Sequence, residues 1–215
     1  MGGFNGLSFA FGAMHAAMSA RTHDPGEPAR RPHPAGATPA AAQSSPGAAI
    51  PLPICGDFDM RIARDGTWFY HGSPIGRKPL VKLFASVLRR EHDGTYWLVT
   101  PVESGRIAVD DAPFVAVALD VAGAGRDQIL VFRTNLDETV EAGADFPIRI
   151  AEDPKTGEPA PYVRARQGRD GRPGLEALIA RPVFYQLVEL AVEDPNDPGR
   201  LGVWSRGVFF PLGKP

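Results

Sequence analysis

A pattern that occurs twice along the chain limits the fold more than any other feature. Residues 58–65 begin with alternating apolar and polar side chains, and residues 146–153 echo them in the same order. Apolar residues also follow Pro79 and Pro182 at matching helical offsets, and a strand-like segment comes after each of these helices. Two matches in the same order favour a duplicated strand–helix–strand element. We therefore expect an α+β fold made of two related halves.

The composition of the first 50 residues separates them from the rest of the chain. They hold 13 Ala, 7 Gly and 6 Pro, and no hydrophobic periodicity continues after Met18. Such a segment buries too little apolar surface to offset the entropy that is lost on ordering. The sequence therefore predicts a disordered tail over residues 1–50, an N-terminal half over 51–140 and a C-terminal half over 141–215.

The remainder of the chain has the patterns of short strands and two helices. The turn residues Arg64-Asp65-Gly66 between two apolar segments predict an N-terminal β-hairpin. Pro79 is typical of a first helical turn, so a helix is expected from there to about Arg90. A second helix should begin near Pro182 and end before the turn residues 194–199. The other predicted strands cover residues 96–99, 106–109, 114–119, 129–133, 203–204 and 208–210, and residues 136–140 are expected to extend the sheet.

The overall charge excludes several classes of function. The chain has 23 basic and 25 acidic residues, so it lacks the global basic surface that binds nucleic acid or anionic lipid. No apolar run approaches the ~20 residues needed to cross a bilayer. The N-terminus lacks the basic region of a signal peptide. We therefore expect a cytoplasmic protein that binds neither nucleic acid nor membrane.

The residue types that hold metals are scarce. Cys55 is the only cysteine, which excludes an intramolecular disulfide and any site built from several thiolates. His71 and His92 are the only histidines after residue 50, and the carboxylates of the chain show no metal-ligand spacing around them. The sequence therefore predicts no metal site, and it contains no motif that indicates a cofactor.

A few side chains have the chemistry needed for hydrolysis. Glu103 or Asp111 could act as a general base and His71 as an acid. Asp111, however, lies in an Asp-Asp-Ala-Pro sequence that is typical of a turn. Ser205 does not fit a nucleophile elbow, because Gly202 stands three residues before it and a strand pattern follows. A hydrolase that uses Glu103, Asp111 and His71 remains an alternative.

Arginines occupy matching places in the two repeats. Arg77 lies just before the first helix and Arg181 at the start of the second. Helix N-termini attract anions, and guanidinium groups add charge-assisted hydrogen bonds to phosphates or carboxylates. Arg164 and Arg166 alternate along a predicted strand, so both are expected on the same side. In the other interpretation, Arg77 and Arg181 pair with local carboxylates such as Glu103 or Glu176.

Four further stretches resemble a known family when they are taken together in their order. They are Asp65-Gly66-Thr67-Trp68 followed by His71-Gly72, Ile75 and Arg77; Tyr96-Trp97-Leu98-Val99-Thr100-Pro101-Val102-Glu103; Val109-Asp110-Asp111-Ala112-Pro113-Phe114; and Gly202-Val203-Trp204-Ser205. With these motifs, residues 56–213 resemble the bacterial DUF1285 family. The resemblance implies a repeated structural motif and a C-terminal half like pleckstrin-homology domains. It also implies a nucleotide-like ligand between the two halves and a signalling role, without an established activity.

These observations lead to one expectation and a second alternative. We expect a non-enzymatic protein that binds a small anionic ligand between its halves. The arginines would contact phosphate oxygens, Glu103 would accept from a ribose or base donor, and Tyr185 would stack or hydrogen-bond. The candidate contacts are Arg77, Glu103, Arg164, Arg181, Tyr185 and Ser205. The second alternative is a protein-interaction adaptor, in which the pleckstrin-like half presents a sheet edge or groove to a partner.

Overall fold

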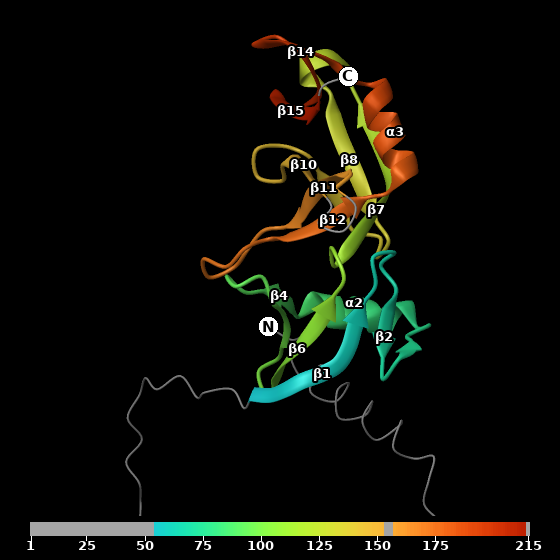
Figure 1. Ribbon diagram of the computed structural model, residues 1–215, viewed down its shortest axis with the longest axis vertical. Coiled ribbons are helices and arrows are strands. Elements are labelled where there is room, and N and C mark those ends of the chain that lie inside the picture. The colour runs from blue at the N-terminus through green and yellow to red at the C-terminus, as the bar shows by residue number, and fades with distance from the viewer. Residues whose placement is uncertain (1–53, 153–156, 214–215) are drawn as a thin grey trace, which may run out of the picture. The chain divides into compact units, whose positions relative to one another are not determined.

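The computed structural model describes residues 54–152 and 157–213 (Figure 1). Ile54–Val99 and Ser104–Pro215 form one compact unit, and Thr100–Glu103 belongs to a separate unit. Within the described residues the fold is mostly β with two α-helices, which agrees with the broad α+β expectation. The tail predicted over residues 1–50 lies outside the described residues.

The first sheet contains six strands around one helix. Its strands are β1 (Ile54–Ile62), β2 (Trp68–Tyr70), β3 (Ser73–Pro74), β4 (Leu88–Arg90), β5 (Tyr96–Val99) and β6 (Ser104–Val109), and helix α2 (Lys78–Ser86) connects β3 to β4. The spatial order is β3-β2-β1-β6-β5-β4. Strands β1 and β6 pair in parallel, which joins a three-stranded meander before the helix to a meander after it.

The second and third sheets form the rest of the unit. The second sheet has the order β10 (Ile148–Glu152), β11 (Pro159–Arg166), β12 (Leu175–Ile179), β7 (Phe114–Ala122), β8 (Ile129–Thr134) and β9 (Thr139–Glu141), and a short 3-10 helix, η1 (Gly125–Asp127), lies between β7 and β8. Helix α3 (Arg181–Glu189) follows β12 and packs on β7 (Figure 1). The third sheet is the meander of β13 (Val192–Asp194), β14 (Asp197–Ser205) and β15 (Val208–Gly213).

The predicted N-terminal hairpin is present, and its turn needs glycine for two reasons. Strands β1 and β2 pair antiparallel, and the Asp65 carboxylate accepts the backbone N–H of Thr67 at 2.9 Å. Gly66 has φ +83°, a conformation that other residues rarely adopt. A Cβ atom on Gly66 would also lie 2.4 Å from Nδ2 of Asn135, which donates to the Gly66 carbonyl at 3.3 Å.

Replacing Gly66 by alanine should therefore cost more stability than replacing a glycine that has only the unusual φ. Gly72 has φ +74° and no atom within 4 Å of the place a Cβ would take. We expect Gly72→Ala to lower the free energy of unfolding by about 1 kcal/mol through backbone strain alone. Gly66→Ala should lower it by about 2 kcal/mol, because Asn135 must also move. Equal losses in urea denaturation of the two variants would show that the Asn135 contact contributes nothing.

Helix α2 is shorter than the sequence pattern predicts, because it ends at Ser86 instead of near Arg90. Helix α3 ends at Glu189, before residue 194 as predicted, and β13 starts at Val192. After α2, Leu88 pairs with Leu98 of β5, and the Val87 carbonyl accepts from the Val99 N–H at 3.0 Å. Sheet partners distant in sequence thus complete the backbone hydrogen bonds that a longer helix would have used.

Two loop predictions also need correction. Residues 136–138 do not extend a strand, since β9 begins only at Thr139. They form a tight turn in which the Thr134 hydroxyl accepts the N–H groups of Leu136 and Glu138, and Asp137 has φ +64°. The turn expected over residues 194–199 is shorter, because β14 begins at Asp197.

The hydrophobic core lies between the helices and the sheets. Trp68 of β2 is 1% exposed and stacks on Phe84 of α2 with the ring centroids 6.4 Å apart. Fully buried side chains elsewhere include Phe114, Phe132, Leu130, Leu187 and Val203. Among the described residues, neither helix is long and apolar enough to cross a membrane.

Candidate anion site

One carboxylate lies among arginines from different strands. Glu176 of β12 forms a two-point contact with Arg149 of β10, with Nε to Oε1 at 2.7 Å and Nη2 to Oε2 at 2.6 Å. Arg90 of β4 approaches the same carboxylate at 3.8 Å between Nη1 and Oε2. Arg164 of β11 stands opposite Glu176 in the strand register. Three arginines therefore surround one partly buried glutamate.

A second carboxylate extends this cluster. Asp111 accepts a hydrogen bond from the Tyr162 hydroxyl at 2.7 Å and lies 3.3 Å from Nε of Arg64. The Arg149 guanidinium stacks over the Tyr162 ring, 4.5 Å from its centroid. On the other side, Arg90 lies over the Tyr96 ring at 5.8 Å. We call the eight residues Arg64, Arg90, Tyr96, Asp111, Arg149, Tyr162, Arg164 and Glu176 the arginine cluster.

Burial and neighbouring charges shift the pKa values of this cluster. Burial alone would raise the pKa of Glu176, but hydrogen bonds from Arg149 and the charges of Arg149, Arg90 and Arg164 lower it overall. Burial and the hydrogen bond to Asp111 raise the pKa of Tyr162 well above its usual value. Both carboxylate and phenol are therefore held in their usual charge states around neutral pH, so neither is poised as an acid–base catalyst.

The cluster contains more positive than negative charge. Its four arginines face two carboxylates, and the Nε atoms of Arg90 and Arg164 are buried without a hydrogen-bond acceptor in the described structure. A buried guanidinium N–H that lacks an acceptor is unfavourable, and an anion would supply one. Gly174 leaves room for the Arg164 side chain, because a Cβ there would lie 3.1 Å from the arginine Cδ.

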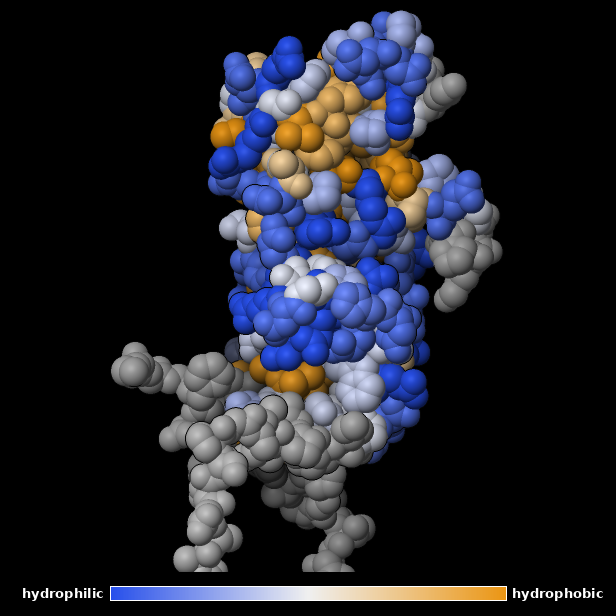
Figure 2. All heavy atoms as spheres, turned by 90° about the vertical axis from the view of Figure 1, so that its left-hand side faces the viewer, coloured by the Kyte–Doolittle hydropathy of each residue, from blue (hydrophilic) through white to orange (hydrophobic). Residues whose placement is uncertain are grey.

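The surroundings of the cluster are strongly polar. The hairpin between β11 and β12 approaches the turn after β4, where Nε of Arg172 contacts both oxygens of Glu91 at 2.9 Å. Figure 2 faces the side on which Figure 1 draws this hairpin, and hydrophilic residues dominate the middle of that face. Apolar residues gather above them in the same view. A charged small molecule would thus meet a polar surface here.

Comparison with known protein families shows to which family the chain belongs. Residues 51–112 match the family described as "Domain of unknown function (DUF1285), N-terminal domain", and residues 113–212 match "Protein of unknown function (DUF1285), C-terminal domain". The chain belongs to the DUF1285 family. The two family domains meet at residues 112 and 113, so the arginine cluster takes residues from both: Arg64, Arg90, Tyr96 and Asp111 from the first and the others from the second.

Solved structures of other DUF1285 proteins are similar to this chain. A DUF1285 family protein from Silicibacter pomeroyi DSS-3 is 54% identical, with a TM-score of 0.68 over 76% of this chain and 84% of that chain. A second, from Shewanella baltica OS155, is 26% identical, with a TM-score of 0.46 over 61% of this chain and 91% of that chain. A search of curated proteins found no match.

The structure of this DUF1285 chain separates the arginines that the sequence put forward. Arg77 precedes α2 and Arg181 opens α3, as predicted, and both are exposed. The two helices pack on different strands (Figure 1). The suggested pairing of these arginines with Glu176 is wrong, since Glu176 is taken by Arg149 and Arg90. Arg164 is the one predicted contact that lies in the arginine cluster.

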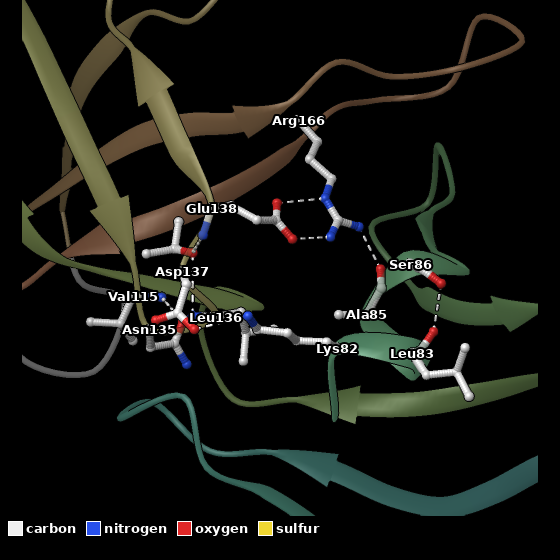
Figure 3. A network of polar contacts seen from close by, with 11 residues as sticks. Lys82, Leu83, Ala85, Ser86, Val115, Asn135, Leu136, Asp137, Glu138 and Arg166 are labelled. Carbon is white, nitrogen blue, oxygen red and sulfur yellow. Dashed lines mark hydrogen bonds and ion pairs between the residues drawn. The ribbon is translucent and has the colours of Figure 1, made fainter. Parts of the chain in front are cut away.

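Arg164 and Arg166 do not share one side of β11 as predicted. Arg164 is opposite Glu176 and Arg166 opposite Leu175, so a bulge between them breaks the alternation. Arg166 instead contacts both oxygens of Glu138 and donates to the Ala85 carbonyl of α2 (Figure 3). It connects the two family domains but lies apart from Glu176 in the hydrogen-bond network.

The remaining predicted contacts occupy three different environments. The Ser205 side chain is fully buried, and its hydroxyl accepts from the Leu130 N–H at 3.0 Å and donates to the Ala142 carbonyl at 2.7 Å. Those bonds give it a structural role. Tyr185 is 57% exposed on α3. Glu103 closes a turn in which its backbone carbonyl accepts from Thr100.

The groups of the hydrolase alternative have separate partners. His71, at φ +46°, places Nδ1 2.8 Å from Oδ2 of Asp59 at the surface, and Asp111 binds Tyr162 and Arg64. The described residues contain no group of three side chains that could hold a metal ion. His71 and Asp111 thus each bind a different partner.

Sequence reasoning missed Arg90, Arg149 and the two tyrosines. Arg149 alternates with apolar residues along its strand, which by itself indicates only an exposed polar face. The local signal that was available is the number of arginines on neighbouring strands. It could not reveal the cluster, because β4 belongs to one sheet and β10, β11 and β12 to another, and Arg90 meets Glu176 only through the packing of the two sheets.

Proposed function

We propose that this DUF1285 protein is a non-enzymatic binding protein for a small anionic, nucleotide-like ligand, which it holds between its two domains in a signalling role. The observation that carries the proposal is the pair of buried, acceptor-free Nε atoms of Arg90 and Arg164. They come from different domains and surround Glu176, whose charge Arg149 already satisfies. A phosphate group supplies acceptor oxygens of the kind that these guanidinium N–H groups lack.

A repeated architecture is part of the same proposal. The order β1-β2-β3-α2-β4-β5-β6 matches β10-β11-β12-α3-β13-β14-β15, and both helices have nine residues with proline second. The first and last strands pair in the first set, and β10 contacts β15 in the second. A pleckstrin-homology-like C-terminal half is proposed with it, supported by the antiparallel meanders and single helix of residues 157–213. A ligand bound between two such units would hold them in one relative position.

The proposal can be tested by calorimetry with pyrophosphate and adenosine diphosphate as probes. Arg164→Ala and Arg90→Ala should each weaken binding about tenfold or more, because each removes a charge-assisted hydrogen bond. The melting temperature should stay constant or rise, since removing one arginine relieves repulsion from the others. Arg133→Ala is the matched control, because Arg133 is exposed on β8.

Two further variants locate the ligand. If Arg77→Ala or Arg181→Ala weakens binding while Arg164→Ala does not, the anion lies at a helix start, as the sequence analysis expected. A Kd of about 1 mM corresponds to a binding free energy of only about −4 kcal/mol. If neither probe binds even at about 1 mM, the proposed ligand class is wrong.

A further inference from the structure

The outward face of α3 differs from the matching face of α2. In α2, Lys78 and Lys82 both contact the Asp137 carboxylate at 2.8 Å, and Ala85 is fully buried. Ion pairs to Asp137 and a hydrogen bond from Arg166 to the Ala85 carbonyl therefore hold one stripe of α2 (Figure 3), while the two lysine side chains stay 49% and 44% exposed. Hydrogen bonds from Lys78 and Lys82 lower the pKa of Asp137 to about 2, so the pairing persists over the whole physiological range.

Under the proposed repeat, Pro79 corresponds to Pro182. Lys78, Lys82 and Ala85 of α2 then correspond to Arg181, Tyr185 and Val188 of α3. Val188 is 47% exposed where its equivalent Ala85 is fully buried, and Tyr185, 57% exposed, replaces the ion-paired Lys82 with an aromatic side chain. Val192, the first residue of β13, is also exposed, at 46%. An apolar stripe of this kind that is rimmed by charges is typical of an interaction site.

The charges on α3 indicate what covers this stripe. Arg181 stands at the N-terminal end of the helix and Glu189 at the C-terminal end, one helical turn on either side of Tyr185 and Val188. The ion pairs of the described residues include neither of them. If two copies of α3 pack antiparallel with Tyr185 at the two-fold axis, Arg181 of each copy lies beside Glu189 of the other. A parallel arrangement would instead place like charges together.

We propose that the α3 stripe is the interface of a symmetric dimer of this chain. The surface is self-complementary, as a two-fold interface requires: an apolar centre of Tyr185 and Val188 lies between one positive and one negative end. On β7, the strand against which α3 packs, Val117 and Val121 are also exposed. A nine-residue helix is only about 13 Å long, so contacts beyond α3 must add to the area of the interface.

Charge reversal provides a sharp test of the dimer by sedimentation velocity over a concentration series. Arg181→Glu and Glu189→Arg should each weaken dimerisation about tenfold or more, because each places like charges together twice across the axis. The double variant Arg181→Glu/Glu189→Arg should restore it to within about threefold of the unchanged protein. Recovery in the double variant requires that the two residues meet, and a parallel or unrelated interface would not give it.

Cross-linking gives an independent readout of the same geometry. In a Cys55→Ser background, Tyr185→Cys should form a disulfide-linked dimer on mild oxidation, because the axis brings this position beside its own copy. Thr139→Cys, exposed on β9, should not. A protein that stays monomeric at about 100 µM, or equal cross-linking of both variants, would overturn the proposal. Anion binding should be unchanged in Glu189→Arg, which keeps this test separate from that of the arginine cluster.

Discussion

Replacing Arg166 by alanine should lower the free energy of unfolding by about 3 kcal/mol. Its guanidinium contacts both oxygens of Glu138, donates to the Ala85 carbonyl and lies 4.9 Å from the centroid of the buried Phe114 ring. Without it, a partly buried carboxylate loses its counter-charge and a fully buried residue loses a hydrogen bond to its carbonyl. The expected loss of unfolding free energy exceeds the usual contribution of an exposed ion pair, because the groups left behind are partly shielded from water.

Urea denaturation with two comparison variants would separate the causes of this loss. Arg133→Ala removes an exposed arginine from β8, a strand of the same sheet, and should change stability by no more than about 0.5 kcal/mol. Arg166→Lys keeps the charge but not the two-point geometry, so it should recover only part of the loss. A loss below about 1 kcal/mol for Arg166→Ala would show that the contact between the two domains is of little energetic weight.

Replacing Trp68 by alanine should have a still larger effect, about 4 kcal/mol. Trp68 is 1% exposed and packs on Phe84, so its removal leaves a cavity between β2 and α2. Trp68→Phe should cost much less. The indole Nε1 is buried without an acceptor, so phenylalanine keeps most of the apolar contact and removes an unsatisfied donor.

Chemical denaturation would measure the loss of unfolding free energy in Trp68→Ala and in Trp68→Phe. The difference between the two losses separates the cost of the cavity from that of the indole N–H. If Trp68→Phe is as damaging as Trp68→Ala, the indole N–H must be satisfied by a group such as an ordered water. If Trp68→Ala costs less than about 2 kcal/mol, α2 must collapse onto β2 to fill the cavity.

The sequence alone determined the features that depend on near neighbours. The β1–β2 hairpin follows from alternating side chains and from a turn that requires Gly66, and both helices begin where proline fits a first helical turn. The apolar run at residues 114–119 became the interior strand β7. Four ordered motifs also sufficed to identify the DUF1285 family. Each of these signals is a short run of neighbouring residues, and the family is identified from the order of four such runs.

Only the tertiary structure decided where the helices end and which charges meet. Helix α2 stops at Ser86 because β5 supplies backbone partners to the residues that follow, and a bulge turns Arg166 away from Arg164. Arg166 reaches Ala85, 81 residues away, and Arg90 meets Glu176 across the two domains. Side-chain pattern specifies a face and a period but neither the strand order nor the packing of one sheet on another. The strand order brings Arg149 and Arg164 to Glu176, and the packing of the first sheet against the second adds Arg90.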